Sequence, residues 1–158
     1  MDKDTTIPAI SNQYQRTLRM FREAVNAFPA DEWRYVGENG YPRPAAIAYH
    51  TLEAIDFYTS GKIGDEFPWG LRFDVEWETK DYERLPSHQQ LLTYLDEIET
   101  KITKWFNQMD ISAPEETYSW TGDTKLENAI YLLRHTHQHT AELSLELHHR
   151  GYQAPEWR

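Results

Sequence analysis

Two histidines four residues apart are the residues of this chain whose spacing is best suited to chemistry. His135 and His139 lie in Leu132–Gly151, a stretch that holds five of the seven histidines. If the stretch is helical, residues at that spacing lie one above the other, with Cβ atoms about 5–6 Å apart. Two such imidazoles can coordinate one metal ion at about 2.0–2.1 Å from each ring nitrogen. The pair is half of a metal site, so a further ligand must come from elsewhere.

His50 is the candidate for that further ligand. It is the polar member of an otherwise apolar stripe on a separate predicted helix. His50, His135 and His139 together offer three neutral imidazoles from two helices, a ligand set that leaves coordination positions open to water or substrate. A single histidine on an apolar face is more often a hydrogen-bonded core residue. The metal hypothesis therefore depends on the three side chains converging.

Two glutamates accompany the predicted ligands. Glu142 follows His139 by one helical turn, and Glu53 follows His50 in the same way. Either carboxylate could accept a hydrogen bond from a metal-bound imidazole, because such rings usually donate their second N–H. Glu142 could also be a further ligand or a proton acceptor in catalysis. The alternative for both is a solvated surface carboxylate.

The other histidines of the stretch are interpreted differently. His137 lies about 200° around the helix from either member of the pair, so we expect it at the surface or at a subunit interface. His148 and His149 fall in the last helical turn, where positive charge complements the helix dipole. We do not expect these three to be ligands.

Four segments have the apolar spacing of amphipathic helices, which predicts an all-α fold, a four-helix bundle. Capping-box patterns, Ser87 with Gln90 and Thr124 with Glu127, mark the starts of the third and fourth helices. Pro29 and Gly61 end the first and second. The predicted helices are Ile10–Phe28, Pro44–Ser60, Ser87–Met109 and Thr124–Gly151.

The second and third helices are separated by a long connection, Lys62–Leu85, that is rich in aromatic side chains. We expect it to be ordered, because large rings pack back onto the body of a domain, and long connections often cover a functional site. Its alternating run Leu71–Trp77 predicts an extended piece or a small hairpin arm. The length also allows a crossover, so simple up-down order need not hold. Gly37, Gly40 and Pro42 predict a loop after the first helix.

Composition narrows the functional classes. The length of 158 residues favours a single domain over residues 1–158. The absence of cysteine excludes disulfides and protein thiolate ligands. A formal net charge of -10 argues against a nucleic-acid partner, which needs clustered Lys and Arg. With neither a membrane-spanning apolar stretch nor a secretory signal, we expect a cytoplasmic protein without a membrane partner.

The arrangement of histidines in this chain resembles that of a known protein family. A histidine on the second helix and an H-x-x-x-H pair on the last, within LRHTHQHTAEL, resemble the DinB-like superfamily, which includes the YfiT-type metal-dependent proteins. The resemblance covers most of the chain, although Ala141 replaces a glycine found in many members. It implies that His50, His135 and His139 hold a divalent ion such as nickel, zinc, iron or manganese. It also implies a homodimer and chemistry with a low-molecular-weight thiol such as mycothiol, bacillithiol or glutathione.

Three functions are consistent with these observations. The first is thiol-dependent transfer or isomerisation on a small electrophilic substrate, with the thiol as cosubstrate. The second is metal-dependent hydrolysis, an activity described for other members of the superfamily. In this chain Glu142 would relay the proton. Both use the same ligands, so the sequence does not separate them. The third is a non-enzymatic bundle that binds a small ligand or a partner subunit, and it predicts no bound transition metal.

Overall fold

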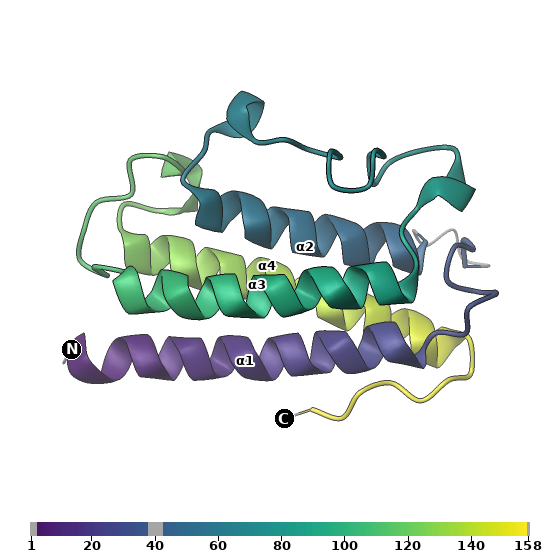
Figure 1. Ribbon diagram of the computed structural model, residues 1–158. Helices are drawn as coiled ribbons and strands as arrows, with labels where there is room; N and C mark the ends of the chain where they lie inside the picture. Colours follow the sequence, from purple (N-terminus) through teal and green to yellow (C-terminus); the bar gives the residue numbers. More distant parts are fainter. Residues whose placement is uncertain (1–2, 38–42, 158) are drawn as a thin grey trace.

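The computed structural model describes residues 3–37 and 43–157, and over these residues it contains four long helices and no β-strand (Figure 1). The all-α four-helix bundle is therefore confirmed. No helix of the described ranges has the length and apolar character needed to cross a membrane. The elements are α1 (Lys3–Ala27), α2 (Pro44–Ser60), η1 (Gly64–Glu66), η2 (Tyr82–Arg84), α3 (His88–Gln108), η3 (Ser119–Thr121) and α4 (Lys125–His149), where η marks a short 3-10 helix.

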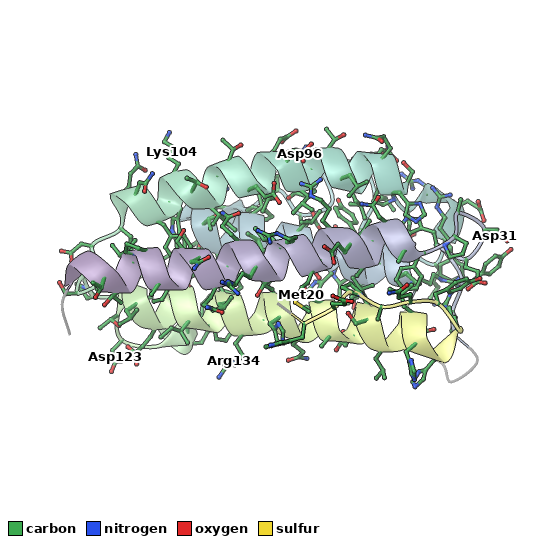
Figure 2. The ribbon with its side chains drawn as sticks, turned by 90° about the horizontal axis from the view of Figure 1, so that it is seen from below. Met20, Asp31, Asp96, Lys104, Asp123 and Arg134 are labelled. Carbon is green, nitrogen blue, oxygen red and sulfur yellow. The ribbon has the colours of Figure 1, made fainter. Side chains whose placement is uncertain are left out.

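Each long helix packs mainly against two of the others. Helix α1 contacts α3 and α4, and α2 contacts the same two. Figure 1 shows α1 and α4 running in one direction and α2 and α3 in the other, and Figure 2, seen from below, shows α1 between α3 and α4. Helices α2 and α3 are therefore parallel neighbours. The connection between them crosses the length of the bundle, as its length allowed.

Short-range interactions set the helix ends that the sequence predicted. The Ser87 hydroxyl accepts a hydrogen bond from the Gln90 backbone N–H, and the Gln90 side chain accepts one from the Ser87 backbone N–H at 2.8 Å. Thr124 and Glu127 form the same reciprocal pair at the start of α4. Gly61 ends α2 in the left-handed region, at a φ of 74°. Each contact satisfies backbone groups that a helix end leaves unpaired.

Helix α1 begins earlier than predicted. It starts at Lys3 rather than Ile10, so that Pro8 lies inside it. Proline removes one intrahelical hydrogen bond there. Thr6 is buried and Ile7 packs against the core, and this packing offsets the loss.

The prediction for Leu71–Trp77 was wrong, because this run forms consecutive turns. The Leu71 N–H donates to the Pro68 carbonyl at 3.2 Å, and the Val75 N–H donates to the Gly70 carbonyl at 3.0 Å. Phe73, Val75 and Trp77 turn inward from this folded loop, whereas Leu71 is exposed. Of the predicted breakers before α2, Gly40 and Pro42 lie outside the described residues.

Helix α2 is covered on all sides. Between Pro44 and Phe57, every residue except His50 and Asp56 is buried. The crossover segment, defined here as residues 67–77, runs back along its outer face. Four contacts mark its course: Phe67 on Phe57 (ring centroids 5.4 Å apart), the Gly70 N–H on the Glu53 carboxylate (2.8 Å), Phe73 on Tyr49 (5.3 Å) and Trp77 on His50 (4.4 Å).

One hydrogen bond crosses the core between α1 and α4. The hydroxyls of Tyr14 and Thr136 lie 3.0 Å apart, and both side chains are fully buried. Thr136 donates its own hydrogen to the Leu132 carbonyl at 2.8 Å. Tyr14 is therefore the donor to the Thr136 oxygen. Burial raises the pKa of Tyr14, which keeps its hydroxyl protonated.

We predict that Thr136→Val destabilises the protein more than Tyr14→Phe. The first change leaves the Tyr14 hydroxyl buried without an acceptor, at a cost of about 1–3 kcal/mol, whereas the second removes one hydrogen bond worth about 0.5–1.5 kcal/mol. Urea unfolding followed by circular dichroism measures both free energies. A larger loss for Tyr14→Phe would contradict the donor assignment.

Candidate metal centre

The three predicted histidines come together where α2 packs against α4. His50, His135 and His139 each offer one ring nitrogen, and these nitrogens lie within 4.8 Å of one another. The ring centroids are 4.5 to 5.4 Å apart. Within residues 3–37 and 43–157 no other group of three or more potential metal ligands meets in this way. All three rings are partly exposed, so the cluster is open to solvent on one side.

The positions of the rings follow from two helices. His135 and His139 are one turn apart on the face of α4 that packs against α2. Helix α2 runs antiparallel to α4 and brings His50 against the same turn (Figure 1). His50 is one of two residues in the first fourteen of α2 that are not buried. The histidine cluster therefore lies at the one residue in the N-terminal half of α2 that is not buried.

The distance between two of the ring nitrogens fits coordination of one ion. The Nε2 atoms of His135 and His139 lie 3.2 Å apart. Two ligand nitrogens at about 2.0–2.1 Å from a tetrahedral ion lie roughly 3.3 Å apart. Both nitrogens therefore face the same point at nearly the separation that a shared ion requires.

Glu142 orients one of the three rings. Its Oε2 atom lies 2.8 Å from Nδ1 of His139, so a carboxylate there accepts the Nδ1–H hydrogen. This contact leaves the lone pair on Nε2, which is the nitrogen that faces His135. The second oxygen of Glu142 lies 3.5 Å from the side-chain amide of Gln138. The sequence allowed this orienting role for Glu142 and also a ligand role, and the geometry places the carboxylate behind His139.

Glu53 does not have the corresponding role beside His50. It is 2% exposed and accepts a hydrogen bond from the backbone N–H of Gly70 in the crossover segment. Burial is the largest cause that raises the pKa of Glu53, to about 7, and the Gly70 N–H opposes the rise. The sequence allowed two roles for Glu53, a hydrogen-bond partner of an imidazole and a solvated surface carboxylate. Both predictions were wrong, because the crossover segment lies over this part of α2.

Burial keeps two of the imidazoles neutral. Burial is the largest cause that lowers the pKa of His50 to about 4, and the neighbouring His139 and His135 act in the same direction. Burial and His139 likewise lower the pKa of His135 to about 4. At neutral pH both rings therefore carry a free lone pair. The Nδ1 atoms of both are buried and have no hydrogen-bond partner among the described residues.

The remaining histidines lie elsewhere. The His137 ring is 5.1 Å from that of Trp157, so the C-terminal tail packs over it. His148 and His149 are exposed at the end of α4, as predicted. His88 stacks on Trp33 with ring centroids 4.1 Å apart.

Sequence reasoning missed the aromatic side chains around the cluster. Trp77 covers one face of the His50 ring, and Tyr131 precedes His135 by one turn. The aromatic content of the predicted connection was the available signal for Trp77. For Tyr131, the available signal was its i, i+4 spacing from His135.

Three imidazoles with an accessible side form a donor set of the catalytic type, because the ion they would hold keeps open positions. No protein-family model matches this chain, and no curated protein matches it in sequence. The geometry of the three-histidine cluster is therefore the basis for a functional proposal.

We predict that the metal-free protein loses stability as the pH falls from about 6.5 toward 4. The unfolded chain binds protons at His50 and His135 near pH 6.5, whereas the folded chain binds them near pH 4. Above about pH 6.5 these two groups no longer lower the free energy of unfolding. Near pH 5 they make the free energy of unfolding fall by on the order of 1–3 kcal/mol for each unit of decreasing pH. Urea unfolding at several pH values, with chelator present, measures it.

The control separates these groups from other titrating side chains. A variant with His50→Asn and His135→Asn should show a flatter dependence over the same range, and a His148→Asn variant should match the wild type. Identical slopes for the wild type and the double variant would refute the assignment.

Proposed function

We propose that this protein binds one divalent transition-metal ion through His50, His135 and His139. The observation that carries the proposal is the convergence of three ring nitrogens, two of them 3.2 Å apart. Lowered imidazole pKa values favour metal binding, because protons compete less with the ion. Glu142 supports the site by fixing the tautomer of His139. Imidazole ligands favour zinc, nickel or iron over manganese.

We further propose that the site serves an enzyme reaction in which an exogenous thiol attacks a small electrophilic substrate. The ion would supply Lewis acidity that lowers the pKa of a coordinated thiol. The chain has no cysteine, so the thiol would enter as a cosubstrate. The alternative, metal-dependent hydrolysis, requires a general base for water. Glu142, the predicted proton relay, contacts Nδ1 of His139, whereas Nε2 is the nitrogen that faces His135 and would bind the ion, which favours the thiol reaction.

Membership of the DinB-like superfamily, with pairing as a homodimer, is part of the same proposal. Two features support it: the order of a histidine on α2 and an H-x-x-x-H pair on α4, and a bundle in which α2 and α3 are joined by a crossover.

We predict that untagged protein binds one equivalent of Zn²⁺ or Ni²⁺ and that His135→Asn or His139→Asn removes tight binding. Loss of a ligand should weaken the affinity by more than the roughly 10–100-fold expected for Glu142→Gln, which changes only the partner of His139. Isothermal titration calorimetry measures the affinities, and elemental analysis measures the metal content.

His137→Asn is the matched control, because His137 lies on the same helix between the two ligands and packs against Trp157. It should bind metal as the wild type does. Equal losses in the His137 and His135 variants, or retention of one tight equivalent in the His135 and His139 double variant, would contradict the proposed ligand set.

We predict that the metal-loaded protein accelerates conjugation of glutathione or another small thiol to 1-chloro-2,4-dinitrobenzene. A variant with both His135→Ala and His139→Ala should react at the uncatalysed rate, because two of three ligands are gone. The absorbance of the thioether product follows the reaction. Cleavage of a 4-nitrophenyl ester without added thiol would favour the hydrolase alternative.

A further inference from the structure

A pair of tyrosines lies beside the three-histidine cluster. Tyr131 precedes His135 by one turn of α4, and Tyr58 follows His50 by two turns of α2. Their rings are 5.4 Å apart and their hydroxyl oxygens 3.5 Å apart, and both side chains are partly exposed. The tyrosine pair and the histidine cluster therefore occupy adjacent turns of the same α2–α4 contact.

The hydrogen bonds of this pair have one direction. The Trp120 indole N–H donates to the Tyr58 hydroxyl oxygen at 3.0 Å, and the Tyr58 hydroxyl donates to the Tyr131 oxygen at 3.5 Å. An indole N–H can only donate, so the chain of donors runs from Trp120 to Tyr131. Among residues 3–37 and 43–157 the Tyr131 hydroxyl accepts from Tyr58, so its own hydrogen is not used in that contact. That hydrogen is available to a bound molecule.

The surroundings favour a negatively charged acceptor. The Arg134 guanidinium lies 5.4 Å from the centre of the Tyr131 ring. Figure 2 shows Arg134 projecting outward from α4. Burial raises the pKa of Tyr58 to about 12, so the Tyr58 hydroxyl stays protonated at neutral pH. A hydroxyl donor with an arginine beside it suits an anionic oxygen.

We propose that Tyr131 donates a hydrogen bond to a carboxylate or phenolate oxygen of the thiol cosubstrate bound at the three-histidine centre, with Tyr58 and Trp120 orienting its hydroxyl. This inference rests on the metal-binding function proposed above. Trp77 packs against the His50 ring and adds an apolar wall to the site. The class of cosubstrate is therefore a small aromatic thiol that carries an anionic oxygen about one helical turn from the sulfur at the metal.

Aromatic thiols bound to the Co²⁺-loaded protein test the proposal. The sulfur would occupy an open position of the metal, and the thiolate-to-cobalt absorption band reports binding. The probes are 2-, 3- and 4-mercaptobenzoate, with thiophenol as the probe that lacks the carboxylate. We expect the best mercaptobenzoate isomer to bind the wild type more tightly than thiophenol.

Tyr131→Phe should weaken that isomer about tenfold or more, as expected for a hydrogen bond to a charged group. The same change should leave thiophenol binding within about twofold, because only the carboxylate contacts Tyr131. Trp120→Phe, which removes the first donor of the chain, should cause a smaller loss with the same selectivity. Tyr35→Phe, an exposed tyrosine in the loop after α1, is the matched control and should change neither affinity.

The outcomes separate this inference from the function on which it rests. Thermal unfolding and the cobalt content of each variant show that fold and metal are retained. Equal loss of thiophenol and mercaptobenzoate binding in Tyr131→Phe, or no loss of either, would overturn the inference alone. A wild-type protein that takes up no cobalt, or shows no thiolate band with any probe, would overturn both proposals together.

Discussion

The cover that the crossover segment places over α2 is the constraint on which the rest of the structure depends. A helix buried on nearly every side needs apolar contacts on its outer face, and residues 67–77 supply them. The segment is held by the Gly70 N–H on the buried Glu53 carboxylate. Gly70 has a φ of 72°, and a Cβ there would lie 3.1 Å from the Val75 carbonyl oxygen, so this turn favours glycine. The same segment places Trp77 against His50, so it both covers the core and contributes one wall of the histidine site.

The histidine cluster is electrostatically costly to the protein that contains it. Its rings are close enough to repel when protonated, and burial disfavours the charged forms as well. Two buried Nδ1 atoms lack partners among the described residues. A core selected for stability alone would carry apolar residues at these positions. Such local conflicts are expected at functional sites, where stability is reduced for the sake of chemistry.

Local patterns predicted most of the fold, and long-range contacts account for what they missed. Ser87 with Gln90 and Thr124 with Glu127 identified two helix starts because a capping box is complete within four residues. The three histidines of the cluster were predictable because the i, i+4 pair and the polar residue on an apolar stripe are both local features. The role of Glu53 was not, because its partner Gly70 belongs to a loop whose course no local pattern specifies. Leu71–Trp77 was misread because inward-facing side chains of a folded loop alternate as those of a strand do.

The crossover also bears on how the chain emerges from the ribosome. Each contact between α2 and residues 67–77 joins positions only 10 to 27 residues apart, whereas Tyr14 meets Thr136 across 122 residues. At roughly 5–20 residues per second, the outer face of α2 is shielded within a few seconds of its synthesis. Its inner face has no partner until α3 and α4 follow. The cover on the outer face of α2 is thus local along the chain, whereas the cover on its inner face comes from helices made later.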